Sequence, residues 1–344
     1  MNDENLSRRQ FINQSFRSAG LCVLSGAAAA APGVALHAAA TSATSPFAYD
    51  VDRLSRIDPK LLVYEQIRKI SGLGAEPRRI AIAPQNRLYV ATGAGVDILD
   101  GEAGKVAEIP LSAPAQCVAV ADDGTIYVGL RTHVEVFDAK GKSIAVWEAP
   151  TEKAWLTGLA VGANDLFAAD SAGRVIYRYD RSGKMVGRIG EKNPDRNVPG
   201  LIVPSPYLDV KLGPDGLLRV NNTGRHCVEV FTANGDLELS WGKPGLAIES
   251  FCGCCNPVGL ALLGDGRCIT CEKGLPRVKV YSADHTLEAV VAGPEQFPDN
   301  GRPGQNSNRR DGTLGGLDAA VDSSGRIYIL DLVAGDVRVM KRKS

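Results

Sequence analysis

The chain has 344 residues, of which 44% are hydrophobic and 23% are charged, a length that fits either two average domains or one large β-propeller. Its 39 basic residues are matched by 39 acidic ones, so the chain lacks the basic footprint of a nucleic-acid-binding protein and no nucleic-acid partner is expected. The order of its elements and its eight cysteines carry more information.

The first 40 residues have the features of an export signal. Ser7-Arg8-Arg9-Gln10-Phe11-Ile12 resembles the twin-arginine motif, and a weakly apolar, Ala/Gly-rich segment ends at the small-residue cleavage site Ala38-Ala39-Ala40. Glycine and proline make this segment a poor membrane span, and none is expected in the mature chain. The resemblance implies export to the periplasm, or beyond, by a route that carries cargo already folded.

After a linker over residues 41–61, one pattern recurs from residue 62 to residue 344. Each copy has an apolar alternation, a tight Gly/Asn turn, a short β-rich run, a loop, a second β-rich run ending in an aromatic residue, and a third run. The first two copies begin at Ile80–Val90 and Val118–Val128. Six copies with four β-runs each predict an all-β fold, a six-bladed β-propeller.

The copies resemble NHL-type repeats, as Asp123–Val128 with Val134–Gly141 illustrates, and six such motifs stand in register. The sixth copy ends at Val337-Arg338-Val339-Met340 and lacks its outermost strand. The β-rich segment Leu62–Ile70 precedes the first copy, so we expect it to complete the last blade and close the ring, which leaves no open sheet edge.

Long insertions lie between the outer strand of one blade and the inner strand of the next, and one of them carries Phe251-Cys252-Gly253-Cys254-Cys255-Asn256-Pro257. Such connections share a face with the turns between second and third strands. Cys271 at the end of a predicted strand and His226-Cys227 in the preceding blade are expected near the same face. The candidate site is therefore a cysteine-rich cluster at blades 4 and 5.

Three interpretations of this cluster stay open. Two or three disulfides could pin the loop to its blades, as is usual in an oxidising compartment. Alternatively, a metal ion or iron–sulfur cluster could be bound by thiolates, the candidate ligands being Cys252, Cys254, Cys255 and Cys271 with Cys227 or His226 in reserve. In the third interpretation, Cys254 and Cys255 form a redox-active vicinal dithiol and disulfide. Cys268 and Cys271 start on opposite faces of one strand, which argues against a bond between them.

The resemblance also implies enzymes, since six-bladed propellers of this kind include hydrolases, lactonases and lyases that work at the mouth of the central channel. Zinc sites of the amidating-lyase type need convergent histidines, and His133, His226 and His285 of the mature chain are not placed to converge. Calcium sites of the lactonase type use acidic and amide side chains in the channel.

Aligning the inner strands on their turns places one residue of each blade at a common level of the channel: Arg79, Cys117, Thr157, Asp209, Gly259 and Asp318. Asp209 and Asp318, with Asn256 near the mouth, are thus weak catalytic or cation-binding candidates. The simpler interpretation is that the two aspartates form ion pairs between blades with Arg79 or Lys211.

Taken together, the sequence predicts an exported propeller that is a binding or redox module through its cysteine-rich face. The alternatives are an enzyme acting at the channel mouth and a protein-interaction scaffold. A periplasmic protein or a small molecule is the expected partner.

Overall fold

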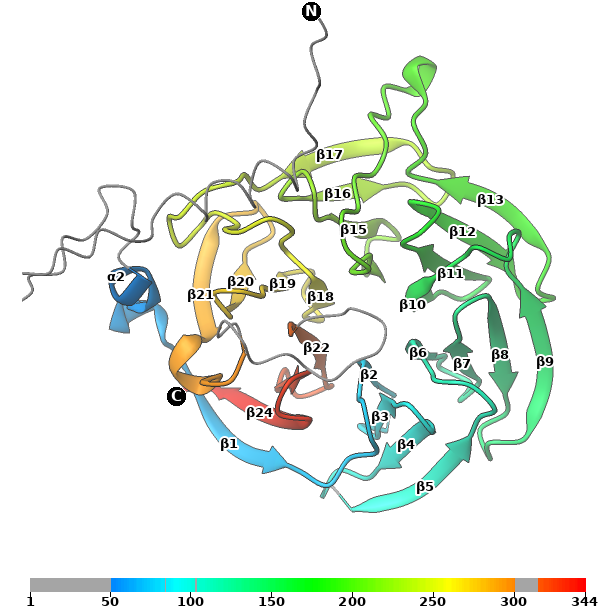
Figure 1. Cartoon of the computed structure of the whole chain (residues 1–344), viewed down its shortest axis with the longest axis horizontal. Helices are drawn as coiled ribbons and strands as arrows, with labels where there is room; N and C mark the ends of the chain where they lie inside the picture. Colours follow the sequence, from blue (N-terminus) through cyan, green and yellow to red (C-terminus); the bar gives the residue numbers. More distant parts are fainter. Residues whose placement is uncertain (1–50, 84, 103, 301–314) are drawn as a thin grey trace, which may run out of the picture. The chain divides into compact units, whose positions relative to one another are not determined.

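Short runs of alternating apolar residues separated by glycine and asparagine turns fold here into antiparallel sheets. The structure is a computed structural model that describes residues 51–83, 85–102, 104–300 and 315–344. These residues form six four-stranded antiparallel sheets set around a central axis (Figure 1). The predicted six-bladed β-propeller is confirmed. The predicted export signal and residues 41–50 of the predicted linker lie outside the described residues.

Each blade runs from an inner strand at the axis to an outer strand at the rim. The strands of blades 1 to 3 are β2 (Arg79–Ile82), β3 (Leu88–Ala91), β4 (Gly95–Leu99), β5 (Lys105–Pro110); β6 (Cys117–Val120), β7 (Ile126–Gly129), β8 (His133–Phe137), β9 (Ser143–Glu148); β10 (Leu156–Val161), β11 (Asp165–Asp170), β12 (Val175–Asp180) and β13 (Met185–Ile189). Those of blades 4 to 6 are β14 (Val210–Leu212), β15 (Leu218–Asn222), β16 (Cys227–Phe231), β17 (Leu237–Trp241); β18 (Gly259–Leu262), β19 (Cys268–Cys271), β20 (Val278–Tyr281), β21 (Leu287–Ala292); β22 (Leu317–Val321), β23 (Ile327–Asp331), β24 (Asp336–Arg342) and β1 (Tyr64–Ile70). Helical structure in the described chain is limited to α2 (Val51–Ser55) and the 3-10 turns η1 (Pro59–Leu61), η2 (Pro194–Arg196) and η3 (Pro294–Gln296).

The ring is closed by β1, as the sequence predicts. β1 pairs antiparallel with β24, from Tyr64 opposite Arg342 to Ile70 opposite Val337. The first strand of the propeller is therefore the outer strand of blade 6. Tyr64 and Ile70 are buried, whereas Ile67 at the middle of the strand is 46% exposed. The buried ends hold the strand against its blade, and pairing satisfies the backbone of β24 that would otherwise form an open edge.

The turns between inner and second strands are built as the pattern requires. Gly124, Gly216, Gly266 and Gly325 have φ values between 75° and 86°, in the left-handed region that glycine enters without steric cost. Asn86 takes the same role in blade 1 with φ 57°. Apolar side chains of neighbouring sheets pack between the blades and form a series of hydrophobic clusters around the ring.

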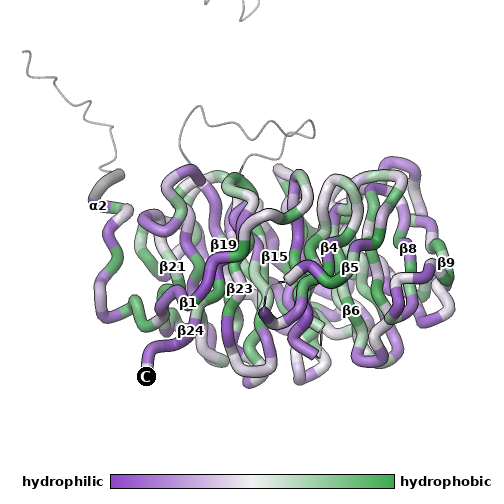
Figure 2. Tube along the Cα trace, turned by 90° about the horizontal axis from the view of Figure 1, so that it is seen from below, coloured by the Kyte–Doolittle hydropathy of each residue, from purple (hydrophilic) through white to green (hydrophobic). Residues whose placement is uncertain are grey.

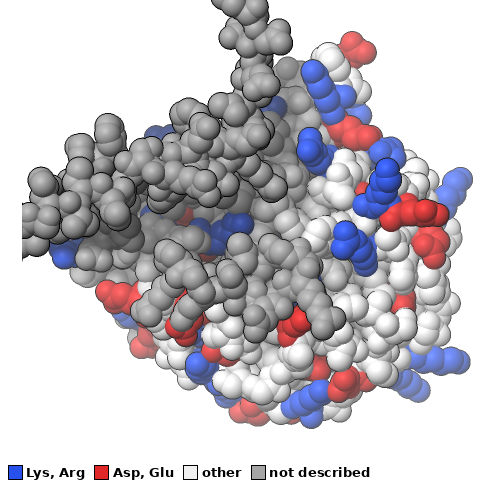
Figure 3. Space-filling model, viewed as in Figure 1, with Lys and Arg blue, Asp and Glu red and all other residues white. Residues whose placement is uncertain are grey.

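Viewed from the side, the strands run between two faces that carry the loops (Figure 2). We call one of them the connection face: it bears the links from each outer strand to the next inner strand, and the turns between second and third strands. The view in Figure 3 shows charges of both signs interspersed over the described surface, in keeping with the equal charge counts. Among the described residues, no helix is long and apolar enough to cross a membrane.

Candidate functional site

Side chains of blades 4 and 5 anchor the cysteine-bearing loop between β17 and β18. Phe251 packs against the rings of Trp241 and Tyr281, whose centroids lie 6.3 and 5.9 Å from its own and 4.8 Å from each other. The buried Lys279 ammonium donates hydrogen bonds to the carbonyl oxygens of Ile248 (3.0 Å) and Ser250 (2.9 Å). Because a buried ammonium is held only where its protons are accepted, these bonds fix the loop against the strands.

A buried charge cluster supports this anchor. Glu272 follows β19 and is fully buried, with Lys279 Nζ at 2.7 Å from Oε1 and Arg277 Nη2 at 2.9 Å from Oε2. The amide of Cys252 donates to Glu272 Oε2 at 3.5 Å. Burial lowers the pKa of Lys279 although Glu272 favours its charged form. The cluster connects the start of the cysteine motif to the turn between β19 and β20.

Asn256 fastens the end of the same motif. Its side-chain Nδ2 donates to the carbonyl oxygens of Cys252 (2.6 Å) and Lys273 (3.0 Å), and its Oδ1 accepts from the Lys273 amide (2.9 Å). Asn256 is 1% exposed. Its amide group is thus hydrogen-bonded to the backbone of the loop and of the β19–β20 turn. The side chain has a structural role, because it joins these two segments.

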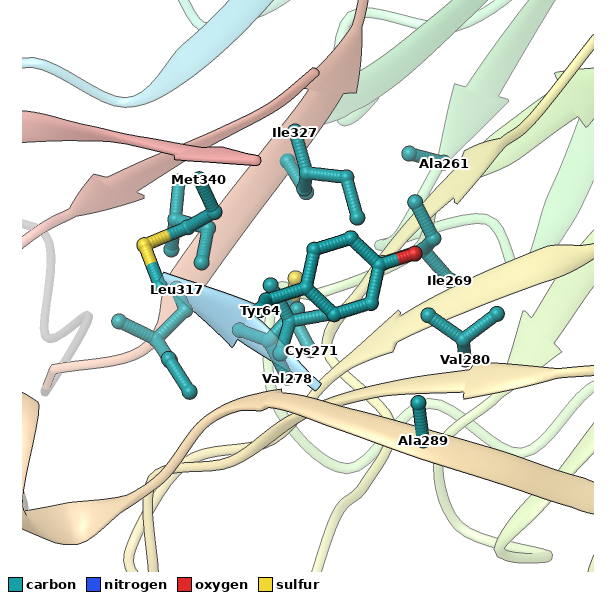
Figure 4. Packing of buried hydrophobic residues seen from close by; sticks show 14 of the residues in the cluster. Tyr64, Ala261, Ile269, Cys271, Val278, Val280, Ala289, Leu317, Ile327 and Met340 are labelled. Carbon is teal, nitrogen blue, oxygen red and sulfur yellow. The ribbon is translucent and has the colours of Figure 1, made fainter. Parts of the chain in front are cut away.

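The six residues considered as metal ligands are not brought together. Cys271 pairs across the sheet with Gly259 and Val278, and its side chain lies in the apolar cluster between blades 5 and 6 (Figure 4). Cys227 lies in blade 4 with its pKa raised by burial to about 11, and His226 occupies the preceding turn with φ 57°. In the described part of the chain, no three His, Cys, Asp or Glu side chains are grouped to hold a metal ion.

The expected convergence of Cys227 and Cys271 on the cysteine loop is therefore corrected, because they form no metal-binding group with its cysteines among the described residues. Cys271 ends its strand on the connection face, as expected, but the register of β19 turns its side chain into the apolar interior. Burial raises its pKa well above the ordinary value. Cys268 points the other way, into the cluster between blades 4 and 5, so the prediction that these two residues face opposite sides of the strand is confirmed. In this structure, no disulfide joins any of the seven cysteines of the described residues.

Cys254 and Cys255 are the pair that the structure does bring together. Their Sγ atoms lie 3.2 Å apart, with Cys254 exposed and Cys255 buried. Burial raises the pKa of Cys255, but the influence of the nearby Ser205 side chain and the hydrogen bond with the Cys254 thiol outweigh it. The Lys273 ammonium acts in the same direction, and the pKa of Cys255 lies below its ordinary value.

The pKa of Cys254, the other thiol of the pair, is shifted in the opposite direction. The hydrogen bond to Cys255 is the main cause that raises the pKa of Cys254, followed by burial. The first thiolate of the pair thus forms on Cys255, and Cys254 keeps the shared proton. Lys273 also lies over the ring of Tyr207, 4.4 Å from its centroid, which holds the ammonium near the two thiols.

Sequence reasoning did not include Ser205 or Lys273 in this site. Lys273 stands two residues after Cys271, where the end of β19 reaches the connection face, so its strand position was a usable signal. Ser205 comes from the long connection before β14, and no spacing in the sequence relates it to Cys255.

The aligned channel residues form a buried ion-pair network, as the simpler interpretation predicts. Arg79 Nη1 lies 2.8 Å from Asp318 Oδ1 and 3.5 Å from Asp209 Oδ2. The same guanidinium donates to the carbonyl oxygens of Thr157 (3.0 Å) and Val258 (3.4 Å). One side chain from blade 1 therefore reaches across the axis to four other blades or their connections.

Both carboxylates are bound by hydrogen bonds and ion pairs within this network. Asp318 Oδ2 accepts from the amide of Ile80 at 2.8 Å, and Asp209 accepts from the amide of Leu260 at 2.9 Å and from Lys211 Nζ at 3.1 Å. Burial raises the pKa of Asp318. For Asp209 the attraction of Lys211 and Arg79 overcomes the effect of burial, and its pKa is lowered.

Arg79 also divides the channel. A Cβ atom at Gly259 would lie 3.0 Å from the Leu317 carbonyl oxygen and 3.2 Å from Asp318 Oδ1, so glycine leaves room for the ion pair of Asp318 with Arg79. Toward the connection face lies a small cavity of about 30 Å³ bordered by Arg79, Thr157 and Tyr207. Toward the opposite face, a cavity of about 230 Å³ is lined by apolar residues of all six inner strands, with Lys211 as its one charged lining residue among those described.

Comparisons with known proteins identify the fold. No protein-family model and no curated protein sequence matches the chain. Among solved structures, a streptogramin B lyase is similar with a TM-score of 0.55 and 14% identity over 81% of this chain and 97% of its own. Virginiamycin B lyase from Staphylococcus aureus matches with a TM-score of 0.54 and 13% identity over 81% of this chain and 99% of its own. The WD40 propeller domain of Doa1 matches equally well, at 0.55 and 9% identity over 82% and 98% of the two chains. At such identities the likeness extends to the propeller and no further.

Proposed function

We propose that the chain is an exported NHL-type propeller that is a thiol–disulfide redox module through Cys254 and Cys255. The observation that carries this proposal is the 3.2 Å contact between their sulfur atoms, with Cys254 exposed and the pKa of Cys255 lowered. An accessible thiol beside a stabilised thiolate is the arrangement that thiol–disulfide exchange requires.

The exchange needs a partner disulfide, either in another exported protein or in a small molecule. Cys254 passes its proton to the Cys255 thiolate and attacks one sulfur of the partner, whose S–S bond breaks as a mixed disulfide forms with Cys254. The leaving thiolate of the partner then takes this proton from the Cys255 thiol, which becomes a thiolate again. Cys255 then attacks the Cys254 sulfur and releases the second partner thiolate. The pair loses two electrons, the partner gains them, and the reaction runs in either direction according to potential.

Lys273 and Ser205 support the step at Cys255. The Lys273 ammonium and the polar Ser205 side chain both favour the thiolate form of Cys255, in keeping with its lowered pKa. The rigid bracing by Asn256 and by the Glu272–Lys279 pair holds the loop in place on blade 5. A preorganised loop keeps the two sulfur atoms adjacent, which favours the closing attack.

The alternatives have less support. An enzyme using Asp209, Asp318 and Asn256 would need free polar groups at the mouth, whereas all three side chains are engaged by their neighbours. A thiolate-bound metal or iron–sulfur cluster would need ligands that the described residues do not bring together. A protein-interaction scaffold suits the fold, but no contact described above favours it over the dithiol.

The test is a redox titration of the mature protein in glutathione buffers, followed by free-thiol counting and peptide mass spectrometry. We expect one disulfide, between Cys254 and Cys255, that forms reversibly and disappears in Cys254→Ser and in Cys255→Ser. Cys252→Ser is the matched control in the same loop and should leave the titration unchanged. Persistence of both thiols in excess glutathione disulfide, or a bond that uses Cys252, would refute the proposal.

The proposed export has a separate test. Replacing Arg8 and Arg9 by lysine should retain the protein in the cytoplasm, whereas the unchanged chain should appear in the periplasm with its N-terminus near residue 41. Appearance of the doubly substituted chain in the periplasm would contradict the twin-arginine assignment without bearing on the dithiol.

A further inference from the structure

A hollow on the connection face over blades 1 to 3 is separate from the dithiol. Its volume is about 760 Å³, and it is formed by the connections before β2 and β6, the turns β3–β4 and β7–β8, and the residue before β10. The polar and aromatic side chains that line it are Glu76, Arg78, Gln116, Arg131 and Trp155. The volume is in the range of cavities that accept small organic molecules.

Hydrogen bonds fix the floor of this hollow. Gln116 Oε1 accepts from Trp155 Nε1 at 3.2 Å and from Arg78 Nη1 at 3.4 Å, and Gln116 Nε2 donates to the carbonyl oxygen of Pro114 at 3.2 Å. The amide of Trp155 donates to Asp170 Oδ1 at 2.8 Å. The indole ring and the Arg78 guanidinium are thus positioned by one glutamine from the neighbouring blade.

The two arginines that line the hollow have different surroundings. Arg78 pairs with Glu76 at 3.0 Å. Arg131 is exposed and lies on the ring of Trp155, with Cζ 4.3 Å from the centroid, and no acidic side chain of the described residues forms an ion pair with it. The aromatic ring therefore restricts where the Arg131 guanidinium can lie.

We propose that this hollow binds a small organic carboxylate. A guanidinium presents paired N–H groups that match the two oxygens of a carboxylate, and an ordered Arg131 keeps that fork directed along the Trp155 ring. The remainder of the lining, including Ala75, Ala94 and Pro114, is small and apolar and suits a carbon skeleton. No cysteine lines the hollow, so a test of this binding site is independent of the redox proposal.

The experiment uses calorimetry and tryptophan fluorescence on the mature protein with citrate, succinate and benzoate as probes. Trp147 and Trp241 are buried, whereas Trp155 is half-buried in the hollow, so a ligand there should change chiefly the emission of Trp155. We expect saturable 1:1 binding of at least one probe, and loss of the fluorescence response in Trp155→Phe.

Paired arginine variants separate a specific site from general surface charge. Arg131→Gln should weaken binding at least tenfold. Arg225→Gln removes another exposed arginine, on the connection face of blade 4, and should leave binding unchanged. Failure of all three probes to bind, or equal losses in the two variants, would overturn the proposal. Inorganic phosphate binding as tightly as the best carboxylate would overturn the assignment of ligand class. Circular dichroism of each variant verifies that it is folded.

Discussion

Replacing Arg79 by methionine should destabilise the propeller strongly, because two buried carboxylates depend on that guanidinium. Asp209 is 0% and Asp318 1% exposed. Asp209 keeps its ion pair with Lys211 at 3.1 Å in the variant, whereas Asp318 keeps the hydrogen bond from the Ile80 amide but loses its ion pair with Arg79. Removing one partner of a buried pair costs about 3–5 kcal/mol in the free energy of unfolding.

The pH dependence of the loss identifies its cause. Burial already raises the pKa of Asp318 above its ordinary value, and loss of Arg79 raises it further. A carboxyl group with a folded-state pKa above its unfolded one favours folding at low pH and loses that contribution as the pH rises through the folded-state pKa. The deficit of Arg79→Met should therefore be small near pH 4 and should grow toward neutral pH.

Urea unfolding of the two proteins from pH 4 to pH 8 measures this deficit. The double variant Arg79→Met/Asp318→Asn removes the uncompensated charge and should recover much of the loss at pH 7. An unchanged unfolding free energy in Arg79→Met, or a deficit that is equal at every pH, would refute the reasoning.

Three further predictions concern the thiol pair, the ring closure and the loop anchor. Lys273→Met should raise the pKa of Cys255, so the pH at which its alkylation by iodoacetamide accelerates should move upward; no movement would exclude Lys273 as the source of the shift. Tyr64→Ala should cost about 3–5 kcal/mol in urea unfolding, because its aromatic ring is buried at the ring closure. The matched control Ile67→Ala, on the same strand but exposed, should change stability by no more than about 0.5 kcal/mol, and equal effects of the two would contradict the described closure. Lys279→Met should release the loop before β18, seen as faster backbone hydrogen exchange there, whereas unchanged exchange would show that the loop is held by other contacts.

The fold was predictable from the sequence because each blade repeats a local pattern. The turn residues set the register of the inner strands, and that register alone predicted that Arg79, Asp209 and Asp318 would meet at one level. The three side chains form ion pairs because the closed ring brings the equivalent positions of all blades around one axis. The closing role of residues 62–70 followed from counting strands.

The site was predictable only in part. The position of Cys271 at the end of β19 predicted that it lies at the connection face of the propeller. That position did not predict where the side chain points, and the side chain lies in the apolar cluster between blades 5 and 6. The contact between Cys254 and Cys255 is local and was among the sequence alternatives. Ser205 and Trp155 take their roles from neighbours on other blades, and no repeat spacing reports the conformations of the connections that carry them.

The pairing of β1 with β24 sets an order of events during synthesis. The first strand of the propeller to leave the ribosome finds its partner in the last one, almost the whole described chain later. At about 5–20 residues per second, β1 waits on the order of tens of seconds with its polar backbone unpaired. Blades 1 to 5 can assemble in that interval, but the ring cannot close before β24 has been made. Completion of blade 6 therefore reports that every strand of the propeller has been made.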